Sequence, residues 1–206
     1  MRLPPLLYRF LQWLVHGDYE ETRAAIDQWY APHSGRPVLE LGCGTGTFAR
    51  FFPAGAYTGV DMDGGRIGRA RVLNPHARFE AADATALSDE FVRGFPLIFT
   101  FNFFHHLSEE QCARVFQTVD RSASEGGTLM LVGEPVLPRF WSNPIGYLLA
   151  KADDGDFVRS MAETQRLFSR YLLRVTPGKT KLIWPVPGAW FELRLPGGIR
   201  DRKPQA

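Results

Sequence analysis

Short apolar strands alternate with helical segments through the middle of this chain, and this alternation limits the fold more than any other feature. Residues 97–101 have the continuous apolar character of a strand that is covered on both faces. Strands alternating with helices predict a parallel sheet with helices on both faces and right-handed crossover connections. We expect strands at 38–41, 57–60, 77–81, 97–101 and 128–132, and helices at 48–52, 64–72 and 108–123, the last opened by a Ser108–Gln111 capping box.

The two ends of the chain follow different patterns. Apolar residues at helical spacing predict amphipathic helices at 6–15 and 19–30. After Pro135 prolines and glycines interrupt the sequence, and the next expected helix spans 157–172. Residues 174–195 predict two strands, and therefore an antiparallel hairpin added to the parallel sheet.

Composition narrows the classes of protein to which the chain can belong. Its 206 residues suit one domain, and 45% hydrophobic with 22% charged residues is typical of a globular protein. No apolar run is long enough to span a membrane and no signal-peptide cleavage site follows the N-terminal stretch, so we expect a cytoplasmic protein. Two cysteines cannot build a disulfide scaffold or a cysteine-only metal site, and the basic residues are too sparse for a nucleic-acid partner.

A glycine-rich loop, Gly42-Cys43-Gly44-Thr45-Gly46-Thr47, joins the first expected strand to the next helical segment. Glycines let the backbone approach a ligand closely, and N–H groups at a helix start favour polar or negative groups. Thr47 stands where the dinucleotide fingerprint requires Gly or Ala, and the loop lacks the lysine and the spacing of a phosphate loop. The loop therefore predicts a nucleotide-like cofactor without a pyrophosphate.

Acidic residues follow the glycine loop at regular intervals. Asp61 lies 21 positions after Glu40, at the end of the second expected strand, and Asp83 lies 22 positions after Asp61, beyond the third strand. A carboxylate beside the glycine loop can accept two charge-assisted hydrogen bonds from a ribose diol. A carboxylate after the third strand can accept one from an adenine amino group.

These segments resemble the class I S-adenosylmethionine-dependent methyltransferases of the small-molecule branch, which includes enzymes of the quinone-biosynthesis type. The matching residues are Glu40-Leu41-Gly42-Cys43-Gly44-Thr45-Gly46, Gly59-Val60-Asp61, Ala82-Asp83-Ala84, Phe101-Asn102-Phe103-Phe104-His105-His106-Leu107, and Gly126-Gly127-Thr128 through Glu134-Pro135. The resemblance implies an α/β fold, a doubly wound Rossmann-like sheet of about seven strands in the order 3-2-1-4-5-7-6, with strand seven antiparallel and helices on both faces. It also implies S-adenosyl-L-methionine as cofactor.

The resemblance implies roles for the glycine loop and the acid before it. The backbone of Gly42, Gly44 and Gly46 would contact the methionine end of the cofactor, with Cys43 as a small packing residue of the same binding loop. Glu40 would orient the loop and favour a cationic cofactor.

Further cofactor contacts follow from the same resemblance. Asp61 would hold the ribose hydroxyls and Met62 would pack on the adenine face. Asp83 and the Ala84 amide would bind adenine, and Asn102 would lie beside the methionine moiety near the transferred methyl group.

His105 and His106 are the candidate catalytic bases, because they follow the fourth strand at the methyl end of the cofactor. The alternative is that they only shape the start of the helix opened by Ser108. Glu134, at the end of the fifth strand, either contacts substrate or terminates the strand, and Arg159 is either an acceptor-binding or a surface residue. No metal site is expected, since adjacent histidines without convergent partners do not form one.

The sequence therefore predicts in-line methyl transfer to a small, apolar or aromatic acceptor. Two alternatives stay open: an NAD(P)-dependent oxidoreductase on a related fold, and a noncatalytic cofactor- or partner-binding module. Residues 102–105 lack the N/D-P-P-Y/F tetrapeptide of enzymes that methylate nucleic-acid amines, which also disfavours a nucleic-acid partner. The expected organisation is an N-terminal helical cap over 1–35 and a methyltransferase domain over 36–206, in which 136–173 is a substrate-side insertion. The N-terminal helix would cover the acceptor or make a weak membrane-surface contact.

Overall fold

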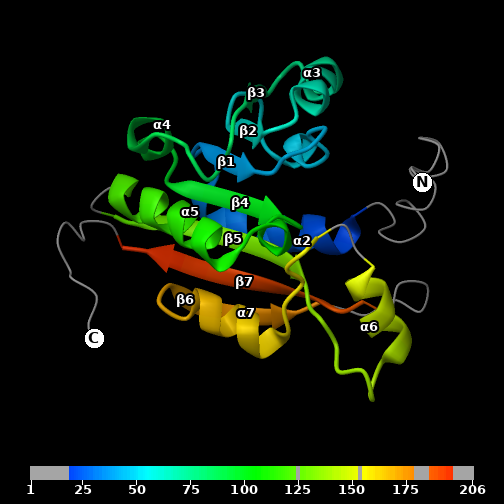
Figure 1. Cartoon of the computed structure of the whole chain (residues 1–206). Coiled ribbons are helices and arrows are strands. Elements are labelled where there is room, and N and C mark those ends of the chain that lie inside the picture. Colours follow the sequence, from blue (N-terminus) through cyan, green and yellow to red (C-terminus); the bar gives the residue numbers. More distant parts are fainter. Residues whose placement is uncertain (1–18, 124–125, 153–154, 179–185, 197–206) are drawn as a thin grey trace.

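The computed structural model describes residues 19–123, 126–152, 155–178 and 186–196. A seven-stranded sheet in the order β3-β2-β1-β4-β5-β7-β6 forms its centre (Figure 1). The pairs among β1 to β5 are parallel, whereas β7 is antiparallel to β5 and β6. This order and the C-terminal hairpin confirm the predicted sheet. The strands are β1 (Val38–Leu41), β2 (Tyr57–Asp61), β3 (Arg78–Ala81), β4 (Leu97–Phe101), β5 (Thr128–Pro135), β6 (Leu172–Pro177) and β7 (Gly188–Leu195).

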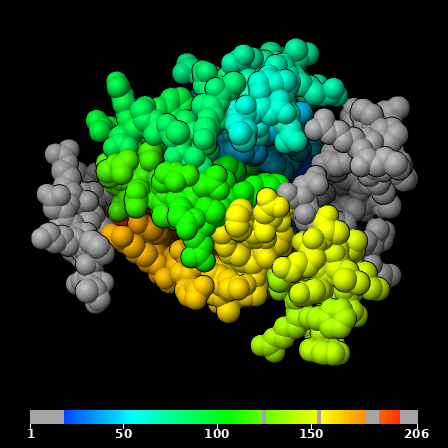
Figure 2. Space-filling model, in the orientation of Figure 1, coloured from blue at the N-terminus to red at the C-terminus, as the bar shows by residue number. Residues whose placement is uncertain are grey.

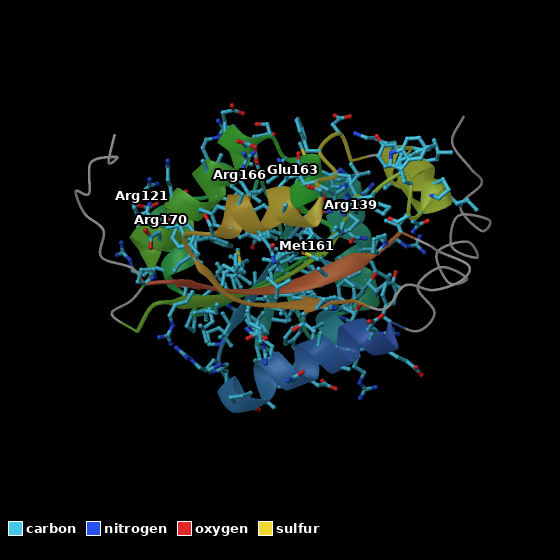
Figure 3. All side chains as sticks on the ribbon, turned by 90° about the horizontal axis from the view of Figure 1, so that it is seen from below. Arg121, Arg139, Met161, Glu163, Arg166 and Arg170 are labelled. Carbon is cyan, nitrogen blue, oxygen red and sulfur yellow. The ribbon has the colours of Figure 1, made fainter. Side chains whose placement is uncertain are left out.

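Helices cover both faces of the sheet, with α2 on one side and α5 and α7 on the other (Figure 3). Each layer has its own apolar core. Ile26 of α2 and Ile67 of α3 belong to one buried cluster, and Phe116 of α5 and Phe168 of α7 belong to the other. The helices are α2 (Glu20–Tyr30), α3 (Gly64–Leu73), α4 (Asp89–Arg93), α5 (Glu109–Ser122), α6 (Pro144–Lys151) and α7 (Met161–Phe168), with 3-10 turns η1 (Ala31–His33), η2 (Ala49–Phe51) and η3 (Phe104–His106).

Local signals account for where several helices begin and end. The Ser108 side chain accepts from the Gln111 N–H and the Gln111 side chain accepts from the Ser108 N–H, so the predicted capping box opens α5. A second capping box, between Ser160 and Glu163, opens α7. It makes α7 shorter than the helix predicted over 157–172, because the chain before Ser160 is bound to other segments.

Other expectations differ from the structure. The helix predicted over 48–52 is only the turn η2, since Phe52 is extended before Pro53 and proline cannot continue a helix. The short helices α4 and α6 were not predicted. The helix predicted over 6–15 lies outside the described residues. No helix in the described parts of the chain has the length and apolar character needed to cross a lipid bilayer.

Candidate functional site

The parallel strands bring the predicted site residues to one edge of the sheet. Asp61 at the end of β2 pairs with Ala81 of β3, and Phe101 at the end of β4 pairs with Gly133 of β5. In parallel strands the carboxyl ends share one edge, which is where ligands bind in this kind of sheet. The residues at this edge are the glycine loop 42–46, Asp61, Asp83, Asn102 and Glu134.

The glycine loop is held against β2 by its backbone. The N–H groups of Gly42 and Cys43 both donate to the Val60 carbonyl, at 2.8 and 3.0 Å. Gly42 has a φ of 75°, and a Cβ there would lie 2.6 Å from the Phe103 ring. The loop is therefore packed between the ends of β2 and β4, and this close approach requires glycine at position 42.

Gly44 differs from its neighbours because it borders open space. Its φ of 54° lies in the left-handed region, and a Cβ there would meet nothing within 4 Å. At Gly46 a Cβ would instead lie 2.7 Å from the Phe79 ring. A ligand can thus approach the backbone at Gly44, whereas at Gly46 the Phe79 ring occupies the space beside the backbone.

Asp61 joins the end of β2 to the glycine loop. Its Oδ2 accepts from the Gly44 N–H at 2.8 Å, and its Oδ1 accepts from the Asp63 N–H at 2.9 Å. The residue is 9% exposed. A carboxylate has about four lone-pair sites, so two remain after these two bonds. Asp61 can therefore accept further hydrogen bonds from a ligand beside Gly44.

Glu40 is buried beneath the loop, where the Tyr57 hydroxyl donates to its carboxylate. Burial raises the pKa of Glu40 to about 8 and the Asp61 charge adds to the rise, whereas the hydrogen bond from Tyr57 opposes it. The pKa of Tyr57 is raised as well, first by burial and then by the Glu40 charge. Glu40 is thus a buried acid whose ionisation responds to charge near the loop.

Cys43 packs inside the loop. Its side chain is buried, and a Cβ at Gly59 would lie 2.7 Å from the Cys43 Sγ. Burial, with the nearby Glu40 and Asp61 charges, raises the pKa of the Cys43 thiol far above its usual range. The thiol stays protonated, which fits packing and not nucleophilic chemistry.

The residues expected at adenine lie on the outer part of the same edge. Met62 is 81% exposed, and Ala84 is partly buried against the core. The Asp83 Oδ1 accepts from both the N–H and the hydroxyl of Thr85, each at 2.8 Å, in a turn that fixes the carboxylate. The structure thus places Met62 and Asp83 beside the end of β3, both accessible to a ligand.

Asn102 leaves β4 in a strained conformation. Its φ is 53°, and Tyr19 is the other non-glycine residue with positive φ among the described residues. The Asn102 N–H donates to the Gly133 carbonyl at 2.8 Å, and its side chain is exposed. Asparagine tolerates this region better than most residues, and such strain is concentrated at functional sites.

Glu134 organises the turn that follows Asn102. Its Oε1 accepts from the N–H groups of Phe103 and Phe104, both at 2.8 Å, and its Oε2 accepts from the His105 N–H at 3.1 Å. The same Oε2 lies 2.9 Å from the His105 Nδ1. Glu134 is 5% exposed. Its carboxylate is thus occupied within the protein, an arrangement that the position of Glu134 at a strand end did not predict.

The two histidines have different environments. His105 is 4% exposed, whereas His106 is exposed, and their ring centroids lie 4.1 Å apart. The His105 Nδ1–Glu134 contact makes Nδ1 the proton-bearing nitrogen and leaves Nε2 as the basic one. The tautomer of the His105 ring is therefore set by the Glu134 carboxylate.

The segment before α7 closes over His105. The Phe157 N–H donates to the His105 carbonyl at 2.9 Å, and a Cβ at Gly155 would lie 2.0 Å from the His105 Cδ2. The Arg159 guanidinium donates to the carbonyls of Phe104 and Leu107, at 3.0 and 2.7 Å. Arg159 thus stabilises η3, and no sequence signal marked Gly155 as a packing position.

No group of three or more His, Cys, Asp or Glu that could hold a metal ion occurs among the described residues.

The comparisons with known proteins agree with this geometry. Residues 38–127 match the family model described as a methyltransferase domain. No curated protein sequence matches the chain. The structure is similar to magnesium protoporphyrin IX methyltransferase from Synechocystis PCC 6803, with 14% identity, a TM-score of 0.64, and 94% of this chain and 88% of that chain covered. That enzyme was solved with S-adenosylhomocysteine and with S-adenosylmethionine bound.

Two further structures share the fold. N-methyltransferase NodS from Bradyrhizobium japonicum WM9 is 13% identical with a TM-score of 0.60, covering 86% of this chain and 96% of that chain. The methyltransferase domain of bacterial CtHen1-CN is 14% identical with a TM-score of 0.66, covering 87% of this chain and 100% of that chain. Residues 38–127 thus form a methyltransferase domain, and the sheet order and the loop geometry agree with the fold of the S-adenosylmethionine-dependent enzymes to which the chain is similar.

Proposed function

We propose that this enzyme transfers the methyl group of S-adenosylmethionine to a small, apolar or aromatic acceptor by in-line displacement. The observation that carries the proposal is the Asp61 carboxylate, which is bound to the Gly44 N–H and keeps two lone-pair sites beside the open side of that residue. This arrangement fits a ribose diol next to an uncharged backbone cradle, and the loop segment from Glu40 to Thr47 has no lysine or arginine for a pyrophosphate.

The same edge offers a contact for each part of the cofactor. The backbone at 42–46 would hold the methionine end, and Asn102 would lie beside it. The Asp83 carboxylate and the Ala84 amide would bind adenine, and Met62 would cover its face. Glu40 would respond to the positive charge by ionising beneath the loop.

Aromatic side chains support an apolar acceptor. Phe101 and Phe103 are half-buried at the end of β4, and the Phe103 ring lies against Gly42. The ring centroids of Phe101 and Trp190 are 5.7 Å apart. One structurally similar enzyme is named as a magnesium protoporphyrin IX methyltransferase. Residues 136–173 would form the acceptor side, since Gly155 and Phe157 of this segment contact His105.

The reaction needs alignment and the exclusion of water more than it needs functional groups of the protein. The cofactor supplies an activated methyl group on a sulfonium. The chain's own residues hold both reactants, and a base is required only where the acceptor must lose a proton. We assign that role to the His105 Nε2, because Glu134 orients the His105 ring.

A labelled-transfer experiment tests the proposal. Cell extract incubated with the enzyme and methyl-labelled S-adenosylmethionine should yield label in a small molecule that enters an organic solvent. Asp61→Ala should lose this signal, while Asp89→Ala, which removes a surface carboxylate from the Arg121 ion pair, should keep it. Label found only in nucleic acid or protein, or equal transfer by the Asp61→Ala enzyme, would contradict the proposal.

A further inference from the structure

Partly exposed aromatic rings meet at the carboxyl end of β4, on the face of the sheet that α2 covers. The Tyr19 ring lies edge to face against Phe101, with the centroids 6.3 Å apart, and the Phe101 ring is stacked against Trp190 at 5.7 Å. We call Tyr19, Phe101 and Trp190 the aromatic wall. These residues come from the position before α2, the end of β4 and β7, so only the tertiary structure brings them together.

Gly133 of β5 makes room for the aromatic wall. It lies between Phe101 and Trp190, which are its partners in the two neighbouring strands. A Cβ at Gly133 would lie 2.6 Å from the Trp190 ring and 2.8 Å from the Phe101 ring. Any side chain here would push the two rings apart, so the continuous aromatic surface requires glycine at this position.

Helix formation does not explain the tyrosine at position 19. Tyr19 occupies the N-cap position of α2 with a φ of 57°, and its side chain makes no capping hydrogen bond. Short polar residues are preferred at an N-cap, and a bulky residue is strained in the left-handed region. Strain of this kind is concentrated at functional sites. We therefore ascribe the tyrosine to the place of its ring, against Phe48 and Phe101.

The aromatic wall adjoins the proposed cofactor site on two sides. Phe48 follows the glycine loop in the chain and is buried, and its ring centroid lies 5.2 Å from that of Tyr19 and 5.1 Å from that of Phe101. Phe101 directly precedes Asn102, the residue proposed to lie beside the transferred methyl group. A molecule that binds on the aromatic wall would therefore lie next to the methionine end of the cofactor.

The side of this edge toward α7 is covered by the protein. The Phe157 N–H donates to the His105 carbonyl at 2.9 Å, and the yellow segment before α7 lies against the green turn after β4 (Figure 2). His105 itself is 4% exposed. An acceptor would therefore contact this edge of the sheet from the side of the aromatic wall.

We propose that the aromatic wall binds the acceptor and selects a planar aromatic ring. Aromatic rings attract one another in offset-stacked and edge-to-face arrangements, so a flat ring gains contacts that a puckered ring of the same size does not. The inference rests on the proposed methyl transfer. It narrows the acceptor from apolar molecules in general to those that contain a planar aromatic ring.

Two probes with the same carbon skeleton test the selection. 2-Naphthol is planar, and decahydro-2-naphthol is its puckered, saturated counterpart. The full chain is first saturated with S-adenosylhomocysteine, which has no methyl group to transfer, and each probe is then titrated and followed by ligand-observed NMR. The affinity for 2-naphthol should be about tenfold higher than that for decahydro-2-naphthol.

Substitutions in the aromatic wall should lower this ratio of affinities. Tyr19→Leu and Trp190→Leu each replace a ring by an apolar side chain and should lower the ratio by about threefold or more, whereas Tyr19→Phe keeps the ring and should keep the ratio. The matched control is Phe95→Leu, which removes a partly exposed ring from a pair with Phe91, at 5.7 Å, where the chain leaves α4. It should leave the ratio unchanged.

S-adenosylhomocysteine affinity equal to that of the unchanged protein verifies the fold and the cofactor site of each variant. Should Trp190→Leu fail to fold, Tyr19→Leu and Tyr19→Phe decide the question. With S-adenosylhomocysteine bound, three results would overturn the inference and leave the proposed methyl transfer standing. They are equal affinities of the unchanged protein for the two probes, an unchanged ratio in the folded wall variants, and a ratio lowered as much by Phe95→Leu as by those variants. Failure of the unchanged protein to bind S-adenosylhomocysteine would contradict the proposed function, and the inference with it.

Discussion

The Asp61 Oδ2 accepts a hydrogen bond from the Gly44 N–H at 2.8 Å and thereby connects the end of β2 to the glycine loop. The contact positions a carboxylate next to backbone that borders open space. Most of the proposed cofactor site depends on this relationship, because it sets the distance between the groups that would hold the ribose and the methionine end.

Asp61→Ala should weaken S-adenosylmethionine binding by about 1.5–3 kcal/mol, the range for hydrogen bonds to a charged group. Isothermal titration measures the change, with Asp89→Ala as the control at a partly exposed carboxylate that pairs with Arg121. A folded Asp61→Ala protein with unchanged affinity for S-adenosylmethionine would contradict the proposal that Asp61 binds the ribose.

Gly44→Ala should impair binding more than folding. Both Gly44 and Gly55 have positive φ, 54° and 79°, and a Cβ at either would meet open space. Alanine should therefore cost about 1 kcal/mol of stability at each position. Only Gly44→Ala should also weaken cofactor binding, by about tenfold or more, since its methyl group would occupy space beside Asp61. Equal affinities of the two variants would show that the cofactor does not approach Gly44.

Glu134 and His105 should be energetically coupled. Glu134→Gln should destabilise the fold by about 3 kcal/mol, because four buried hydrogen bonds lose their negative acceptor. A double-mutant cycle with His105→Gln, followed by urea unfolding, should give a coupling energy of about 0.5–3 kcal/mol. Glu80→Gln, at an exposed position of β3, serves as control. Additive effects would mean that the carboxylate does not position the His105 ring.

Separate replacement of the two histidines identifies the base. If the acceptor loses a proton during transfer, His105→Gln should lower kcat by about 10²–10⁴-fold with unchanged cofactor affinity. His106→Gln should have little effect, since its ring is exposed whereas that of His105 is buried. The rate at which labelled product forms decides between the two residues. A large loss in the His106→Gln enzyme with little loss in the His105→Gln enzyme would assign the base to His106.

Glu40 makes stability depend on pH. Its pKa is about 8 in the folded protein, against an ordinary value of 4.5. Between these values the folded state holds a proton that the unfolded chain has lost, so stability should fall as pH rises across this range. Glu40→Gln is neutral at every pH and can still accept from Tyr57, and it should flatten the curve by a few kcal/mol. Urea unfolding at several pH values measures this, and parallel curves would contradict the assignment.

The same group should make cofactor binding depend on pH. A sulfonium close to the loop would favour ionised Glu40, so binding would release a proton and affinity should rise as pH approaches 8. The Glu40→Gln protein should lack this rise. Titration in buffers of different ionisation enthalpy measures the proton release directly.

The sequence alone determined the sheet, the glycine loop and the acids beside it. These features depend on local patterns: apolar strands between helices, glycines where the backbone turns left-handed, and Asp61 at the end of a buried strand. The capping box at Ser108 was predictable for the same reason, because both partners lie within one turn. Such local patterns are readable from the sequence, since the residues that interact in them are close neighbours along the chain.

Only the tertiary structure decided how the turn after β4 is held. Glu134 lies 29 to 31 positions from the groups it binds, and Gly155 meets His105 from another segment. Their contacts depend on the register of β4 with β5 and on the path of the chain around α6, which no local pattern contains. The same holds for the exposure of Ile145 and Leu148 on α6, because an apolar residue at helical spacing is equally compatible with a core and with an open surface until the packing of the helix is known.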